Sequence, residues 1–236
     1  RAWRPTLYDF LSHRALGFMM NSEPDVSRPA NRFTVNSDEY LKPYVDFVNL
    51  NLTNPSDSLE TKYYALNIMK DLTVFHKNDA NPNALIDIEL LRLDYIYANS
   101  QNAKKDTLYF NSLKALQTKF PSNERVTEID FRIANWYLQK ASKYKPLEGD
   151  SYKWYKKTAK EICESAIAKF PKSYGALECK NTMNAIQSKS FNLTIEEVNE
   201  PNKPLRALVS SQNISKVYFK IVKTTSQELR ELSRKK

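Results

Sequence analysis

Two cysteines are the residues in this sequence whose placement most directly suggests chemistry. Cys163 and Cys179 lie eight positions before and eight positions after Pro171. If this proline marks the turn between two antiparallel helices, both thiols stand at matching heights on apolar faces, and they form a disulfide where their Cα atoms come within about 7 Å. Helix axes lie about 8 to 10 Å apart, so the alternative is two small buried thiols that pack at a helix contact.

Histidine chemistry has little support in the sequence. His13 and His76 are the two histidines of the chain, and neither lies on a carboxylate-rich helix that would supply the set of ligands a zinc site requires. We expect both to be packed or surface side chains, and we predict no metal ligands and no cofactor.

Other catalytic arrangements are equally weak. Three glycines cannot build a Gly-rich phosphate loop of the usual type. Glu196 and Glu197 are adjacent, so on a strand they point to opposite faces and cannot act as an acid–base pair. No nucleophile triad is visible. The sequence therefore predicts a protein that is not an enzyme and has no catalytic or cofactor-binding residues.

A basic stretch accounts for most of the formal net charge of +9. Four lysines recur at spacings of three and four, which on a helix places them on one face: Lys153, Lys156, Lys157 and Lys160. Such a face suits contacts with phosphates. Glu161 and Glu164 stand four residues after Lys157 and Lys160, which favours a solvated helix face with ion pairs, and nucleic acid is not the partner we expect.

The elements that position these residues are mostly amphipathic helices separated by prolines. Thr6 and Asp9 form a capping box for a first helix, along which residues follow at helical spacing: Leu7, Phe10, Leu11, Arg14 and Phe18. Residues 22–36 are expected to form a loop. A second helix is expected to begin near Ser37 and to carry Tyr40, Tyr44 and Phe47.

Two further helices are predicted in the first half of the chain. Asp57 and Glu60 resemble a second capping box, and Pro82 suits the first position of the next helix because its missing N–H costs nothing there. Residues 85–98 are apolar nearly all round, which predicts a helix buried between neighbours.

Four apolar stripes between Tyr109 and Ile186 predict antiparallel helical hairpins. Lys119-Phe120-Pro121 and Lys169-Phe170-Pro171 recur fifty residues apart, each between two apolar stripes. Ala159, Ala166 and Pro171 stand at the offsets of the second helix of a tetratricopeptide repeat. The repeat's Trp-x2-Leu-Gly-x2-Tyr block is missing, and the loop at 145–150 stretches the period. We therefore expect a tetratricopeptide-like domain at residues 1–189 without transferable peptide-groove residues. The apolar stripes are Tyr109, Leu113, Leu116 and Phe120; Val126, Ile129, Ile133 and Trp136; Tyr155, Ala159, Ile162, Ala166 and Phe170; and Tyr174, Leu177, Cys179, Met183 and Ile186.

Aromatic side chains on these helices are expected to pack in the core: Tyr63, Tyr95, Tyr97, Tyr109 and Trp136. Trp3 precedes the first helix, and we expect it to dock the N-terminal segment against the helical array.

The periodicity changes to two after Ser190. Phe191, Leu193 and Ile195 alternate with polar residues, and 205–209 and 217–222 are rich in β-forming residues. Three strands are too few to close a sandwich. The fold class expected is therefore mainly α: tetratricopeptide-like antiparallel hairpins, then at 190–236 a short antiparallel β-segment, the opening strands of an incomplete β-domain.

Two stretches of the sequence resemble a known family. Arg4 to Leu11 and Leu193 to Pro204, the latter followed by Asn213 to Tyr218, resemble the N-terminal region of bacterial α2-macroglobulin-like proteins of the Bacteroidetes type. The resemblance implies a helical leading region followed by the first macroglobulin domain. It also implies a periplasmic or extracellular protease trap, with lipid anchoring of the parent protein as an option.

The family's thioester motif, Cys-x-Glu-Gln, does not occur here. Cys163 precedes Glu164-Ser165 and Cys179 precedes Lys180-Asn181, so any trapping chemistry would lie outside this chain. The chain begins with Arg1 and has no apolar run of the roughly 18 residues that cross a bilayer. We expect it to be cut from a longer polypeptide.

Two functions remain open. The first is a non-catalytic scaffold of such a protease-trapping protein of the cell envelope, with proteases or envelope proteins as partners of the full-length parent. The second is a free-standing tetratricopeptide-type module that binds a protein or peptide in its concave face.

Overall fold

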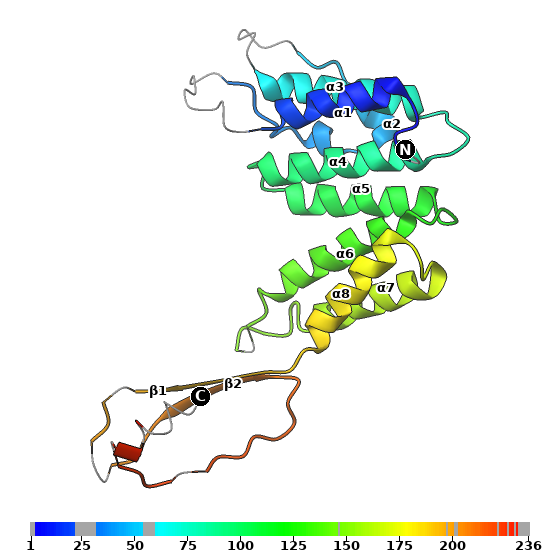
Figure 1. Cartoon of the computed structure of the whole chain (residues 1–236). Helices are drawn as coiled ribbons and strands as arrows, with labels where there is room; N and C mark the ends of the chain where they lie inside the picture. The colour runs from blue at the N-terminus through cyan, green and yellow to red at the C-terminus, as the bar shows by residue number, and fades with distance from the viewer. Residues whose placement is uncertain are drawn as a thin grey trace. The chain divides into compact units, whose positions relative to one another are not determined.

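The computed structural model describes residues 3–21, 32–53, 60–145, 147–196, 198–200, 203–220, 222–225, 227–228 and 230. In this described part, eight α-helices pack antiparallel and are followed by a two-stranded antiparallel β-hairpin (Figure 1). The chain divides into two compact units, residues 1–186 and residues 187–236.

Helix α1 (Leu7–Met19) begins with the predicted capping box. The Asp9 N–H donates to Thr6 Oγ1 at 3.1 Å, and the Thr6 N–H donates to Asp9 Oδ2 at 2.8 Å. Its buried face combines Asp9 and Leu16, each 1% exposed, with Ser12 at 8%. The large apolar residues at helical spacing point outward instead: Leu7 at 72%, Phe10 at 58%, Leu11 at 57% and Phe18 at 64% exposure. Asp9 is tolerated on this buried face because His76, the last residue of the neighbouring helix α3 (Thr61–His76), bonds to its carboxylate.

The helix predicted from Ser37 is divided in two. A 3₁₀ helix, η1 (Asp38–Leu41), is followed by the single turn α2 (Tyr44–Phe47). Lys42 between them is extended because the residue before a proline is disfavoured in the helical region, and Pro43 follows it. Both short elements still reach the core, since Leu41 and Phe47 are buried.

Helices α3 (Thr61–His76) and α4 (Asn83–Asn99) form the first long antiparallel pair (Figure 1). Asp57 of the predicted capping box lies outside the described residues. Glu60 makes no cap bond, and its carboxylate accepts the Phe33 N–H at 2.9 Å. Pro82 is the cap residue of α4, one position earlier than predicted. Burial of α4 nearly all round is confirmed. Residues 22–31 of the predicted loop also lie outside the described part, and 32–36 are neither helix nor strand.

A fully buried arginine fixes the short elements onto α4. Arg92 is 0% exposed. Its guanidinium donates to the carbonyls of Tyr40, at 2.5 Å, and Lys42, at 3.0 Å, and to the carboxylate of Glu89. It also lies 4.2 Å from the centre of the Phe47 ring. Because a buried guanidinium is costly unless its donors are satisfied, this set of bonds determines where η1 and α2 sit.

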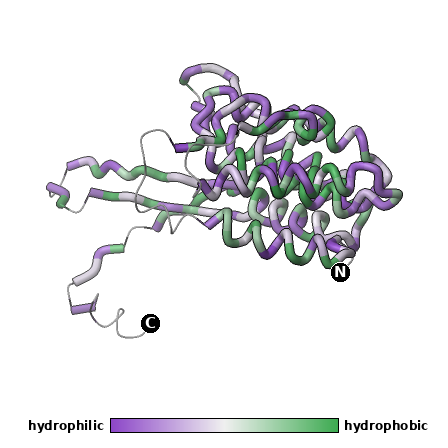
Figure 2. Tube along the Cα trace, turned by 90° about the horizontal axis from the view of Figure 1, so that it is seen from above, coloured by the Kyte–Doolittle hydropathy of each residue, from purple (hydrophilic) through white to green (hydrophobic). Residues whose placement is uncertain are grey.

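The second half of the helical unit consists of α5 (Lys105–Lys119), α6 (Val126–Ala141), α7 (Tyr155–Lys169) and α8 (Tyr174–Gln187). Lys119 and Lys169 are each the last helical residue, so the fifty-residue recurrence marks equivalent helix ends, as predicted. Hydrophobic and hydrophilic residues are interspersed along the helices of the chain (Figure 2).

A close approach connects α8 to α6. A Cβ added at Gly175 would lie 2.2 Å from the backbone carbon of Thr127, so only glycine fits at this contact. The apolar stripe predicted for α8 is only partly buried: Cys179 is in the core, but Tyr174 and Leu177 are exposed.

The second unit contains the β-hairpin. Strands β1 (Ser190–Ile195) and β2 (Ala207–Gln212) pair antiparallel, with Ser190 opposite Gln212 and Ile195 opposite Ala207. The strand predicted at 217–222 is wrong for its described residues, because 217–220 and 222 are not in a strand. Glu197 and Ile221 lie outside the described residues.

Candidate functional site

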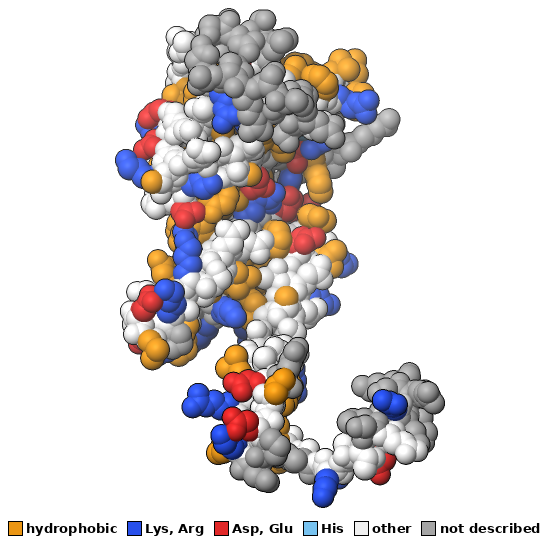
Figure 3. Space-filling model, turned by 90° about the vertical axis from the view of Figure 1, so that its left-hand side faces the viewer, with side chains coloured by type: hydrophobic (Ala, Val, Ile, Leu, Met, Phe, Trp, Pro, Cys, Tyr) orange, Lys and Arg blue, Asp and Glu red, His pale blue; other side chains and the backbone are white. Residues whose placement is uncertain are grey.

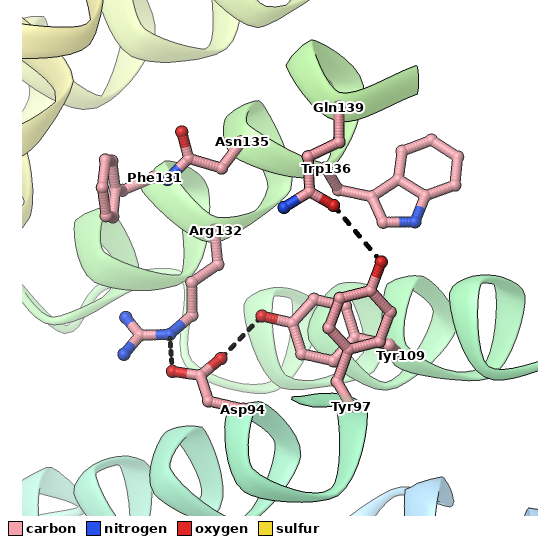
Figure 4. A pocket seen from close by; sticks show the side chains of 8 residues that line it. All are labelled: Asp94, Tyr97, Tyr109, Phe131, Arg132, Asn135, Trp136 and Gln139. Atoms are coloured by element: carbon pink, nitrogen blue, oxygen red, sulfur yellow. Dashed lines mark hydrogen bonds and ion pairs between the residues drawn. The ribbon is translucent and has the colours of Figure 1, made fainter. Parts of the chain in front are cut away.

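An open pocket lies between α4, α5 and α6 (Figure 4). Its volume is about 280 Å³. Aromatic rings and polar side chains line it together: Asp94, Tyr97, Tyr109, Phe131, Arg132, Asn135, Trp136 and Gln139. The chain thus offers a mixed aromatic and hydrogen-bonding surface at this position.

Asp94 organises the polar side of this pocket. Its carboxylate accepts the Tyr109 hydroxyl at 2.7 Å and Arg132 Nε at 2.8 Å (Figure 4). The rings of Tyr97 and Tyr109 stack with their centroids 4.4 Å apart. The Tyr97 hydroxyl donates to Asp106 at 2.6 Å and lies 3.3 Å from Gln139 Oε1.

These tyrosines act as hydrogen-bond donors rather than as bases. Burial, together with the charge of Asp94, raises the pKa of Tyr109 above its usual range. Burial and the hydrogen bond to Asp106 likewise raise the pKa of Tyr97. Both hydroxyls therefore keep their protons at neutral pH and donate hydrogen bonds to the carboxylates of Asp106 and Asp94.

The predicted packing role of the aromatic residues is confirmed. Tyr95 and Tyr109 are buried in the core, and Tyr63, Tyr97 and Trp136 pack against it. The sequence did not predict this pocket. Arg132, Asn135 and Gln139 have the spacing of an ordinary polar side of an amphipathic helix, and Asp94 lies within the stretch 85–98 that was predicted to be a buried helix.

The structure brings the two cysteines together. Cys163 on α7 and Cys179 on α8 are both 0% exposed, and their thiols are hydrogen-bonding partners. Donation to Cys163, together with burial, raises the pKa of Cys179. Both cysteines are present as free thiols. The disulfide remains a prediction, and the two thiols lie close enough to hydrogen-bond to each other.

The predicted lysine face is only partly helical. Lys153 precedes α7 and pairs with Asp150 at 3.1 Å. Lys157 and Lys160 on the helix lie 3.8 Å from Glu161 and 3.3 Å from Glu164. The ion pairs expected at this spacing are therefore confirmed, and they reduce the free positive charge that α7 presents. Lys156 is also exposed on this helix.

Both histidines are packed against carboxylates. His76 Nε2 lies 2.5 Å from Asp9 Oδ1, and its Nδ1 lies 2.7 Å from Asp79 Oδ2. Burial alone would lower the pKa of His76, but the bonds to Asp79 and Asp9 outweigh it and raise the pKa. His13 Nε2 lies 3.4 Å from Asp87 Oδ2.

Asp87 is the centre of a second charged cluster, which docks the N-terminal segment. It accepts Arg4 Nε at 3.0 Å and Arg125 Nη2 at 3.1 Å. Burial acts to raise the pKa of Asp87, but the bond with His13 and the charge of Arg125 lower it well below its usual range. The Trp3 ring lies 4.5 Å from the Arg125 guanidinium, so the predicted docking of Trp3 on the helices is confirmed.

The described residues contain no group of three or more His, Cys, Asp or Glu side chains placed to hold a metal ion. Within the same residues, no helix has the length and apolar character needed to cross a bilayer.

Apolar side chains are exposed at several separate places on the face shown in Figure 3, often beside Lys and Arg side chains.

Comparison of the chain with protein-family models, with curated proteins and with solved structures finds no match in any of the three.

Proposed function

We propose that this chain is a non-catalytic interaction scaffold, the tetratricopeptide-like leading region of an α2-macroglobulin-like protease-trapping protein of the cell envelope. In this proposal the helical unit precedes a β-domain that begins with β1. The partners are proteases or envelope proteins that meet the full-length parent in the periplasm or outside the cell.

The observation that carries the proposal is the partly exposed apolar face of the β-hairpin, on which the Phe219 ring lies 6.3 Å from the Phe191 ring. Side chains alternate between the faces of a strand, so β1 places Phe191, Leu193 and Ile195 on one face, and the register adds Val209 opposite Leu193. These four side chains are 37 to 45% exposed. A sheet face of this kind is normally packed against a second layer, as the opening strands of a β-sandwich would be.

The charged groups of the helical unit support a structural rather than a catalytic role. Asp9, Arg92 and Arg125 are buried and bonded to groups on other elements, and their bonds tie helices to each other. Side chains whose hydrogen-bonding groups are occupied by these contacts between helices are not free to bind or activate a substrate.

The gene that encodes these residues provides the first test. The open reading frame should continue beyond the codon for Lys236 into residues that complete a β-sandwich and further domains of that kind. A stop codon directly after Lys236 would remove the proposal.

Substitutions in the hairpin provide the second test, in the protein with its continuation. Leu193→Asp should destabilise the β-domain, because a charge then enters the face that packs against the second layer. Thr194→Asp, on the opposite face of the same strand, is the matched control and should have little effect. Amide hydrogen exchange of residues 190–212 measures both, and equal protection in the two variants would contradict the proposal.

Protease trapping is tested with the full-length gene product. A trapped protease should lose activity on a large protein substrate and keep its activity on a small peptide, because only the large substrate is blocked by the surrounding protein. Equal inhibition of both activities, or none of either, would argue against a trap.

A free-standing peptide-binding module is the second candidate, and the pocket in Figure 4 favours it. Asn135 and Gln139 stand one helical turn apart on α6 and both line the pocket. A peptide selected on the chain from a random library should lose affinity in the Asn135→Ala variant and keep it in the Lys156→Ala variant, as measured by calorimetry. Loss of affinity in Lys156→Ala, with affinity kept in Asn135→Ala, would exclude this pocket as the peptide-binding site.

A further inference from the structure

The outer side of α8 carries an open groove that the pocket in Figure 4 does not include. Its volume is about 940 Å³. The apolar part of the groove comes from Trp3, Ile167, Tyr174, Leu177 and Met183. Trp3, Tyr174 and Leu177 are 39%, 56% and 55% exposed, so the groove presents large apolar side chains to solvent.

The α5–α6 hairpin, which corresponds to the α7–α8 hairpin, shows what covers the equivalent surface of a helix in this protein. With the fifty-residue recurrence, Leu177 and Met183 of α8 correspond to Thr127 and Ile133 of α6. Both α6 residues are 0% exposed, and the backbone at Thr127 is in contact with Gly175 of the next hairpin. An α-helix thus covers the surface of α6 that the groove leaves uncovered on α8. The equivalent position therefore has the shape that receives a helix.

The charge of the groove determines which kind of helix can bind there. Lys172 and Lys180 line it, and Glu178, which is outside the lining, is hydrogen-bonded to the Tyr174 hydroxyl. At the position of Lys180 the first hairpin has Asp130. A second copy of this chain does not suit the groove. Its most exposed apolar helix is α1, and the charged residue on the outward face of α1 is Arg14, which would meet the two lysines.

We infer that the α8 groove, formed by Trp3, Ile167, Tyr174, Leu177, Met183, Lys172 and Lys180, binds an acidic amphipathic helix of a partner protein. The apolar stripe of that helix packs on Tyr174 and Leu177, and its Asp or Glu side chains pair with Lys172 and Lys180. This mode of recognition places an amphipathic helix in an apolar groove with complementary charges at the rim. The inference deepens the proposed scaffold role by naming a surface and a class of partner.

The probes are two synthetic amphipathic peptides of about 18 residues, roughly five turns of helix. They share one face of Leu and Ala, and their remaining positions are Glu in the first peptide and Lys in the second. Binding of each labelled peptide to the full chain is followed by fluorescence anisotropy at low and at high salt. The Glu peptide should bind, more weakly at high salt, and the Lys peptide should bind at least about tenfold more weakly.

Variants locate the site. Leu177→Asp and Lys180→Glu change exposed residues, so the fold is retained, and each should weaken the Glu peptide by about tenfold or more. Leu147→Asp is the matched apolar control, because Leu147 is fully exposed outside the groove. Lys156→Glu is the matched charge control on α7. Both controls should bind like the unchanged chain.

Several results would overturn the inference. These are no binding of the Glu peptide at low salt, equal binding of the two peptides, and a loss of binding in Lys156→Glu with none in Leu177→Asp, which would move the site to the lysines of α7. None of these results bears on the continuation of the reading frame or on the β-hairpin substitutions, so they test the groove separately from the proposed function.

Discussion

Buried charged side chains connect helices of this protein at the level of single residues. Asp9 of α1 and His76 of α3 are 1% and 2% exposed and bond to one another, while Asp79 holds the other ring nitrogen. A carboxylate at each nitrogen favours the charged imidazole, which can donate to both, and raises the pKa of His76. This pair explains why α1 buries a polar face.

Removal of His76 should leave the carboxylate of Asp9 buried without its partner. We expect His76→Asn to lower the free energy of unfolding by about 3 kcal/mol or more. Asp79→Asn, which changes the more exposed carboxylate, should cost less than about 1 kcal/mol. Urea denaturation followed by circular dichroism measures both, and equal losses would contradict the role assigned to the buried pair.

The same pair predicts a pH dependence. The pKa of His76 is raised in the folded chain, so its contribution to stability is fully present below the unfolded value of 6.5 and is lost as the pH rises through the folded pKa. The pKa of Asp9 is lowered, so its contribution is present above the unfolded value of 3.8 and is lost at lower pH. The difference in unfolding free energy between the unchanged chain and His76→Asn should therefore shrink on the alkaline side. A constant difference up to about pH 9 would contradict this.

The adjacent thiols of Cys163 and Cys179 give a prediction about oxidation. With a disulfide or thiol oxidant as acceptor, the two thiols should form one bond, releasing two protons and passing two electrons to the oxidant. Closing this loop should stabilise the hairpin by about 3 kcal/mol in the chain-entropy model. Peptide mass mapping with and without reductant checks the bond, and the Cys179→Ala variant is the control. Two free thiols after oxidative refolding would contradict the prediction.

At the level of elements, the contact between α6 and α8 depends on a residue without a side chain. Gly175 lies against the backbone at Thr127 and Glu128, where the atoms nearest to an added Cβ would be only 2.2 and 2.3 Å away. A backbone cannot move aside as the end of a flexible side chain can, so the two helices would have to separate.

Gly175→Ala should therefore lower the free energy of unfolding by about 2 to 3 kcal/mol. Gly17 is the matched control, since it also lies in a helix but has nothing within 4 Å of an added Cβ. Gly17→Ala should raise the stability by about 0.5 to 1 kcal/mol, because alanine loses less backbone entropy in a helix. Thermal unfolding of both variants checks the opposite signs, and a neutral Gly175→Ala would contradict the close approach.

Helix positions followed from local signals in the sequence, whereas some helix faces did not. The capping box at Thr6, the repeated Lys-Phe-Pro ends and the apolar character of α4 act over a few residues and can be read directly. The orientation of α1 depends on His76, which is 67 positions away from Asp9. The break at Pro43 was in principle readable, because a proline disfavours helix at the residue before it.

For the whole molecule, the division into two compact units predicts independent stability. A two-stranded hairpin is marginal by itself, and the six residues of β1 are all exposed. The helical unit instead buries two apolar clusters, a large one with residues from Leu16 to Ile133 and a smaller one that joins Ala134 of α6 to α7 and α8.

Removal of residues 188–236 should therefore leave the unfolding midpoint of the helical unit unchanged. Thermal unfolding followed by circular dichroism at the helical wavelengths measures this, with the full chain as reference. A fall of more than about 4 °C, roughly the effect of 1 kcal/mol in a domain of this size, would show that the hairpin contributes to the stability of the helices.

The candidate sites were predictable to different degrees. Equal distances from Pro171 were enough to place Cys163 beside Cys179, because two helices of a hairpin run at matching heights. The pocket around Asp94 combines residues from three helices, and the α8 groove depends on which side of the last hairpin is left uncovered. Neither can be derived from spacing along one helix.

The outward apolar face of α1 reverses the usual pattern of mutational tolerance. In a saturation scan of this helix, polar replacements at Leu7, Leu11 and Phe18 should be accepted and should improve solubility, whereas hydrophobic replacements at Asp9 and Ser12 should be rejected. A consensus design that assigned leucines to the interior would thus damage this helix while appearing to improve it.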